Sequence, residues 1–144
     1  MENRQQLDIS RKFGKSGNRK SVVVETRSDV TEIHKLAEFA LKVILVKVKN
    51  YASLMNVQYG RITIRNQKTR WGSCSSKGNL NFNCLLMLAP DEVVDYVVIH
   101  ELCHLIEMNH SKAFWKQVEQ MMPDYKKHRK WLKDHGNEIM ERMS

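Results

Sequence analysis

The stretch His100-Glu101-Leu102-Cys103-His104 holds two histidines four residues apart, with a glutamate directly after the first. On a helix this spacing puts both imidazoles on one face, one turn apart, where they can share one zinc ion. Glu101 then lies beside the metal, where a carboxylate can take a proton from a zinc-activated water. The neighbouring residues are mostly apolar, so polar groups here would be costly without a partner. The HExxH pattern therefore predicts a hydrolytic zinc site with Glu101 as general base.

A third protein ligand must come from further along the chain, which offers two candidates. On an unbroken helix, His110 would lie about 15 Å along the axis from the first histidine and could not reach the metal. We therefore expect the helix to end near Met108, and Asn109 to turn the chain in the left-handed conformation that asparagine tolerates. Glu107 is the rival ligand, because it lies three residues after the second histidine on the same helix. Spacing alone leaves both candidates open.

The composition fits one globular domain of 144 residues, with 42% hydrophobic and 28% charged residues. A net charge of +8 suits an acidic partner, but charge alone indicates solubility and nonspecific attraction. The first residues are polar and no apolar segment typical of a signal peptide follows them, so we expect no signal peptide. No run of residues approaches the roughly 20 apolar residues of a membrane span. The three cysteines form no CxxC pair, so we expect no disulfides and a reducing cytoplasm. Cys103, within the metal helix, is interpreted as packing.

Residues 1–28 are predicted to form a basic, solvated arm with one short strand over residues 20–26. The charges that leave nucleic acid as a weakly supported partner are Arg11, Lys12, Lys15, Arg19 and Lys20. Residues 29–144 are predicted to form the folded domain. In the first part of this domain apolar residues recur every three or four positions, which predicts one long amphipathic helix that ends before Gly60. We expect this helix to be scaffold.

Three short alternating segments follow, over residues 61–65, 70–74 and 79–83. Tight turns between them predict an antiparallel meander. The last strand leads almost directly into the metal helix, so we expect its edge to lie along the cleft and pair with an extended peptide. The metal helix should begin at Pro90 and run to about Met108, buried on nearly all sides by its valines.

Two shorter helices are predicted near the carboxyl end. Ser111 can cap a helix over residues 112–122, with Phe114 and Trp115 facing inward. A second helix over residues 125–133, stopped at Gly136, carries many lysines and arginines. We interpret this basic face as solvated, with the rim of a site for an anionic substrate as the alternative.

Several blocks of the sequence together resemble one known family. They are Arg70-Trp71-Gly72-Ser73-Cys74, residues 79–90, Tyr96 to Leu105, Asn109-His110-Ser111, Phe114-Trp115, Pro123-Asp124-Tyr125 and Trp131-Leu132. In this combination the chain resembles, over about residues 30–136, the YgjP-like metallopeptidase domain family. These are predicted zinc-dependent hydrolases, distantly similar to SprT-like and WLM proteases. The resemblance implies a zincin-like α+β single domain, zinc on His100, His104 and His110, and Glu101 as the catalytic residue.

The function we predict is a zinc-dependent metallopeptidase with a peptide or protein substrate and no membrane partner. Candidates for substrate binding and for stabilising the oxyanion are Arg70, Asn83 and Tyr125, whereas Trp71 is expected to be a packed core indole. One alternative is a metal-dependent hydrolase of a phosphorylated small molecule or nucleotide, although such sites more often use Mg²⁺ or two metals. The other is a noncatalytic, nucleic-acid-associated zinc protein, although structural sites usually close all four metal positions.

Overall fold

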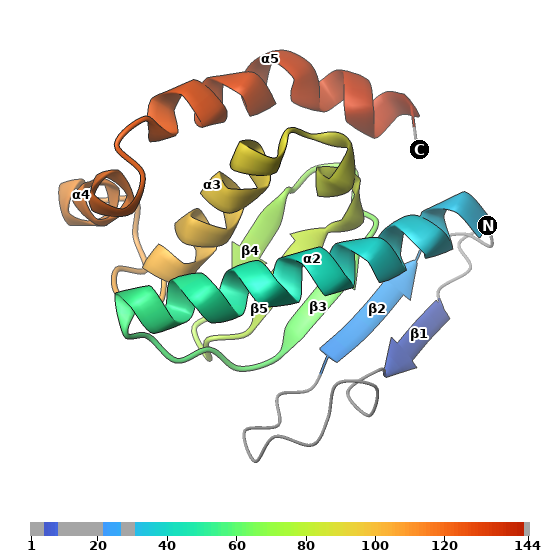
Figure 1. Ribbon diagram of the computed structural model, residues 1–144, viewed down its shortest axis with the longest axis horizontal. Coiled ribbons are helices and arrows are strands. Elements are labelled where there is room, and N and C mark those ends of the chain that lie inside the picture. Colours follow the sequence, from blue (N-terminus) through green and yellow to red (C-terminus); the bar gives the residue numbers. More distant parts are fainter. Residues whose placement is uncertain (1–4, 9–21, 27–30, 143–144) are drawn as a thin grey trace.

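The computed structural model describes residues 5–8, 22–26 and 31–142, which form one sheet with helices packed against it (Figure 1). The sheet has five strands in the order β1-β2-β3-β5-β4. The elements are β1 (Gln5–Asp8), β2 (Val22–Thr26), α2 (Thr31–Met55), β3 (Ile62–Arg65), β4 (Gly72–Cys74), β5 (Leu80–Asn83), the 3₁₀ helix η1 (Cys84–Leu88), α3 (Asp91–Cys103), α4 (Lys112–Met121) and α5 (Tyr125–Arg142). The predicted α+β class is confirmed. The basic block of residues 11–20 lies outside the described residues.

The sheet is mixed, so the predicted antiparallel meander is wrong. β3 pairs with β5 in parallel, with Ile62 opposite Leu80, and β4 pairs with β5 antiparallel, with Gly72 opposite Phe82. β5 therefore returns between β3 and β4 through a tight turn in which Gly78 has a φ of +84°. The edge strand on this side of the sheet is β4, not the last strand as predicted.

Helix α2 connects the neighbouring parallel strands β2 and β3, which need such a crossover because the chain must return from the end of β2 to the start of β3, at the opposite end of the strands. The predicted long helix is confirmed. It ends at Asn56, which has a left-handed φ of 55°. The amide of Asn56 donates to the carbonyl of Ser53 at 3.2 Å, and that of Val57 donates to Ala52 at 3.0 Å. These bonds satisfy carbonyls at the helix end, which is why an asparagine terminates it here.

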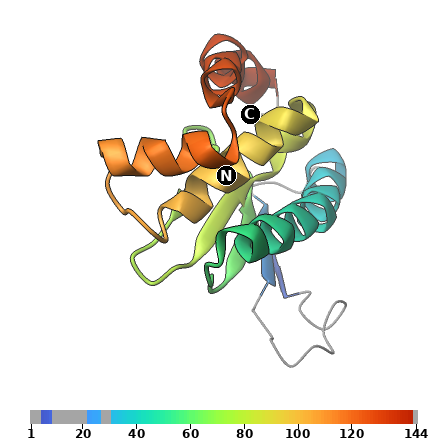
Figure 2. The same ribbon diagram turned by 60° about the vertical axis from the view of Figure 1, so that its left-hand side comes forward.

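Helix α3 is buried on most of its sides. In Figures 1 and 2 helix α3 lies beside α2 and covers the sheet, and it also contacts α4 and α5. Buried residues occur throughout its length, and they are Val93, Val94, Tyr96, Val97, Val98, Ile99, Glu101, Leu102 and Cys103. A polar group on this helix is therefore held rigidly by packing on neighbouring turns.

Three boundaries differ from the sequence prediction. Pro90 is the residue before α3 rather than its first, and α3 ends at Cys103 instead of continuing to Met108. Residues 84–88, assigned to no element, form η1. Gly136 does not stop α5, because it lies buried inside the helix, where a Cβ atom would come within 3.1 Å of the Trp71 ring. The expected packing of Trp71 is confirmed, since its half-buried indole packs against the core.

Within the described ranges, no helix is both long enough and apolar enough to cross a membrane.

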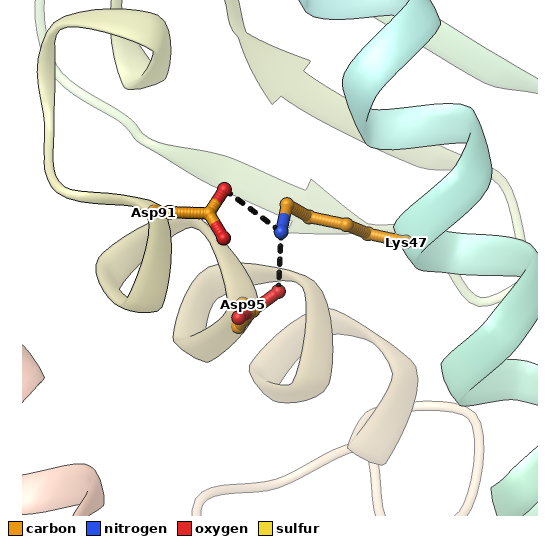
Figure 3. Close-up of polar contacts among 3 residues, drawn as sticks. All are labelled: Lys47, Asp91 and Asp95. Carbon is orange, nitrogen blue, oxygen red and sulfur yellow. Dashed lines mark hydrogen bonds and ion pairs between the residues drawn. The ribbon is translucent and has the colours of Figure 1, made fainter.

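An ion pair ties α2 to the first turns of α3 (Figure 3). The Lys47 ammonium group lies 2.8 Å from Asp95 and 2.9 Å from Asp91. The side chains of Lys47 and Asp95 are only 15% and 17% exposed, whereas Asp91 is 75% exposed. Burial alone would lower the pKa of Lys47, but the hydrogen bonds to Asp95 and Asp91 outweigh it, so this pKa is raised above 10.5. The pair therefore contributes fully at neutral pH, and its contribution is lost as the pH rises through the raised pKa.

We expect Lys47→Met to lower the free energy of unfolding by about 1–2 kcal/mol, because Asp95 would be left half-buried without its cation. Lys42→Met removes an exposed lysine from the same helix and should change stability by less than about 0.5 kcal/mol. Urea denaturation at pH 7 measures both variants. Equal stability of the two would show that the ion pair does not hold α3.

Candidate metal centre

Helix α3 brings two histidines to the point where the chain turns back towards α4. His100 lies in the last turn of α3, and His104 is the residue that ends it, with φ −66° and ψ −16°. His110 reaches the same place from the segment before α4. Its Nε2 atom lies 3.1 Å from Nε2 of His104 and 3.2 Å from Nε2 of His100. The structure thus brings all three predicted histidines together, and their nitrogen atoms could hold one metal ion.

A series of tight right-handed turns places His110. The amides of Leu105 and Ile106 donate to carbonyls three residues back, at 3.0 Å each, and the amide of Ser111 donates to the carbonyl of Asn109 at 2.8 Å. Among the described non-glycine residues only Asn56 has a positive φ, so the left-handed Asn109 that we predicted is wrong. The helix needed no such residue, because it ends several positions earlier than expected.

Ser111 fixes the far side of this turn. Its side-chain oxygen accepts a hydrogen bond from the amide of Phe114 at 3.2 Å, which caps α4 as predicted. His110 therefore directly precedes the N-cap residue of α4. Its backbone is held between this cap and the turns that follow α3.

Hydrogen bonds at the opposite ring nitrogens orient two of the imidazoles. Nδ1 of His104 lies 3.2 Å from the carbonyl of Glu107, which can only accept, so Nδ1 carries the proton. Nδ1 of His100 lies 3.3 Å from the hydroxyl oxygen of Tyr96, which can accept a hydrogen bond from a protonated Nδ1. In these tautomers each Nε2 atom directs a lone pair into the cluster, as a metal ligand must.

The electrostatic surroundings keep these rings neutral. Burial lowers the pKa of His100 to about 3, with additional contributions from His104, His110 and Arg129. Burial also lowers the pKa of His104. Because a protonated imidazole cannot bind a metal, both shifts favour the form that can.

Aromatic side chains from α4 pack around the histidines. Phe114 stacks on His104, with ring centroids 4.4 Å apart and an interplanar angle of 25°. Trp115 stacks on His110, at 5.8 Å and 24°. The sequence predicted that these two residues face inward, but not that they would contact the histidines. Phe114 and Trp115 follow His110 by four and five residues, and this short spacing could have suggested the contacts.

Glu101 is 6% exposed and faces the edge strand β4. A Cβ atom at Gly72 would come within 3.1 Å of Cγ and Oε2 of Glu101, so a glycine there makes room for the carboxylate. Burial raises the pKa of Glu101 to about 8, against the opposing charge of Arg70. A cation bound by the neighbouring histidines would favour the ionised form.

The three suggested substrate-binding residues lie in different settings. Arg70 is exposed just before β4, where its charge acts on Glu101. Tyr125 begins α5 and stacks on Trp115, with ring centroids 5.4 Å apart. These two side chains remain candidates.

Asn83, the third of these residues, has a structural task, and its contact with substrate stays a prediction. The side chain is 2% exposed. Its Nδ2 donates to the carbonyls of Gln67 and Arg70 at 2.8 and 2.9 Å, and its Oδ1 accepts from the amide of Leu85 at 3.0 Å. The amide therefore holds the loop before β4 against the start of η1.

The sequence reasoning also missed Tyr96 and Arg129. Tyr96 lies one helical turn before His100, a spacing that could have suggested the contact. Arg129 packs its guanidinium 4.5 Å from the centre of the Trp115 ring. Its distance along the chain from the histidines gave no signal of this position.

The histidine cluster, together with the comparison with known proteins, supports a metal-dependent peptidase-like hydrolase. The model of the YgjP-like metallopeptidase domain family matches residues 2–135, so the chain belongs to this family. The match begins well before residue 30, where we expected the resemblance to start. A search of curated proteins finds no match.

A solved structure similar in fold is that of the metallopeptidase zymogen of Pyrococcus abyssi abylysin. The TM-score is 0.57 and the sequences are 22% identical, over 63% of this chain and 93% of that chain. At this identity the likeness concerns the fold.

The choice between His110 and Glu107 as third ligand has a direct test. In the described residues the cluster contains only the histidines, and the Glu107 carboxylate is not part of it. We expect His110→Ala to weaken metal affinity at least about 100-fold, whereas Glu107→Ala should change it less than about threefold. Competition with a chromogenic chelator measures both. A larger loss of metal affinity in Glu107→Ala than in His110→Ala would identify Glu107, and not His110, as the third ligand.

Proposed function

We propose that this protein is a zinc-dependent metallopeptidase in which His100, His104 and His110 hold the zinc and Glu101 is the general base. The observation that carries the proposal is the spacing of the three Nε2 atoms. A tetrahedral zinc ion with bonds of about 2.0–2.1 Å requires ligand nitrogens roughly 3.3 Å apart. The separations of 3.1 and 3.2 Å in the cluster fit that requirement.

The donor set supports a catalytic rather than a structural role for the metal. Among the described residues, the cluster offers three imidazoles and no fourth histidine, cysteine or carboxylate. Structural zinc sites usually close all four positions with protein atoms, whereas catalytic sites leave one for water or substrate. A bound zinc ion would supply Lewis acidity and lower the pKa of water to about 7.

The residues of the chain would then perform the proton transfers and the positioning. The Glu101 carboxylate takes a proton from the attacking water and passes it to the leaving amine. The packing of Glu101 against β4 limits its motion, so the carboxylate stays near the reacting atoms. Arg70 and Tyr125 are the remaining candidates for contact with the carbonyl oxygen of the substrate. The free edge of β4 can pair with an extended peptide.

Glu101→Gln tests the assignment of the general base. The amide keeps the shape of the side chain but cannot accept the proton, so we expect kcat to fall by about 10²–10⁴-fold with zinc content unchanged. Glu92→Gln, an exposed change in the first turn of the same helix, is the control. Turnover of a fluorogenic peptide library and zinc analysis by mass spectrometry provide the two readouts. Undiminished cleavage by Glu101→Gln would contradict the proposal, as would purified protein that binds no zinc.

Gly72→Ala tests the room made for the carboxylate. The new methyl group would displace Glu101, and a shift of a few tenths of an ångström should lower kcat by about tenfold. Zinc affinity should be unaffected, because the three atoms nearest to the new Cβ belong to Asn81 and Glu101 and to no histidine. Ser76→Ala, at an exposed position of the same hairpin, is the matched control. If kcat stayed at the unmodified level, the close approach of β4 would have no part in positioning Glu101.

A further inference from the structure

A pocket opens directly beside the histidine cluster. It has a volume of about 510 Å³, the size of a site for a small ligand or a side chain. The residues that line it are His110, Lys112, Trp115, Lys116, Glu119, Tyr125 and Arg129. Since His110 also belongs to the metal centre, a group bound in the pocket would lie next to the reacting bond.

The walls come from two helices. Positions 112, 115, 116 and 119 follow one another at helical spacing, so they form one face of α4. Positions 125 and 129 lie one turn apart at the start of α5. Both helices are anchored, through buried Phe114 and Val118 in α4 and buried His128 in α5. The pocket is therefore preformed by packed elements.

The pocket has an excess of positive charge. Lys112, Lys116 and Arg129 are opposed by one carboxylate, that of Glu119. Over the described part of the chain, none of these three cations forms an ion pair with a carboxylate. Their charges are therefore available to an anionic ligand.

The aromatic wall orients the arginine. The Arg129 guanidinium lies 4.5 Å from the centre of the Trp115 ring. Two other rings that line the pocket stack on this indole, Tyr125 at 5.4 Å and 20° and His110 at 5.8 Å and 24°. A guanidinium that lies over an indole face can still direct N–H groups at a planar carboxylate, whose geometry they match.

We propose that this pocket binds a carboxylate group of the peptide substrate, through Arg129 and Lys116, beside the bond that is hydrolysed. The inference rests on the proposed peptidase function and names its substrate class. The carboxylate can belong to an acidic side chain or to the C-terminus of the substrate. Both present the same planar anion to the pocket.

Binding can be measured apart from turnover. Zinc-loaded Glu101→Gln protein is titrated with matched peptides that carry Glu or Gln at one position, each with a free or an amidated C-terminus. Tryptophan fluorescence reports binding, because Trp115 lines the pocket. We expect a carboxylate peptide to bind about tenfold or more tightly than its amide counterpart. Preference for Glu over Gln identifies the side chain, and preference for the free terminus identifies the α-carboxylate.

Charge variants then assign this preference to the pocket. Lys116→Gln and Arg129→Gln should each reduce it severalfold, and Glu119→Gln should increase it, because the opposing charge is removed. Lys127→Gln removes a lysine from another face of α5, outside the pocket, and should leave the preference unchanged. The same peptides, tested as substrates of the unmodified zinc protein, should show a parallel preference in kcat/KM.

The outcomes separate the two proposals. Equal binding of carboxylate and amide peptides overturns the pocket assignment, as does a preference that Lys116→Gln and Arg129→Gln leave intact. Binding of a single-stranded oligonucleotide that is lost in these variants, without any carboxylate preference, also overturns it in favour of a nucleic-acid surface. A carboxylate preference without peptide hydrolysis supports the pocket and contradicts the peptidase function. Peptide hydrolysis without a carboxylate preference supports the peptidase function and contradicts the pocket assignment.

Discussion

The burial of polar groups on helix α3 is the constraint on which the rest of the structure depends. Glu101 is 6% exposed and His104 is 9% exposed, on a helix whose other sides pack into the core. Such groups are costly to bury unless each finds a partner. The Nδ1 atom of His100 has the Tyr96 hydroxyl as its hydrogen-bond partner, and that of His104 has the carbonyl of Glu107. The Nε2 atoms of the three histidines converge on one another, and a single shared cation could satisfy all of their lone pairs.

The scaffold around α3 supports this arrangement from several directions. The ion pair of Lys47 holds the start of the helix against α2. The side chain of Asn83 fixes the loop before β4, so Gly72 meets Glu101 at close range. Phe114 and Trp115 pack on the two histidines at the other end. The geometry of the proposed site is therefore set by contacts between elements and not by the helix alone.

Chemistry and recognition are divided between different parts of the chain. The proposed metal ligands and Glu101 come from α3 and the turn that follows it, whereas the pocket is built from α4 and the first turns of α5. His110 belongs to both, because it directly precedes α4. Under our proposals, substitutions on the exposed faces of α4 and α5 would change the preferred substrate without altering the catalytic centre.

The sequence by itself determined the features that depend on local spacing. Two histidines four residues apart face the same way on any helix, Ser111 caps the helix that follows, and the apolar rhythm before Gly60 specifies a long helix. The tertiary structure decided whatever depends on distant partners. It placed β5 between β3 and β4, used Asn83 as a structural link, and kept Gly136 inside α5 against Trp71. Backbone geometry fixes spacing over a few residues, whereas these contacts join segments whose proximity only the packed core establishes.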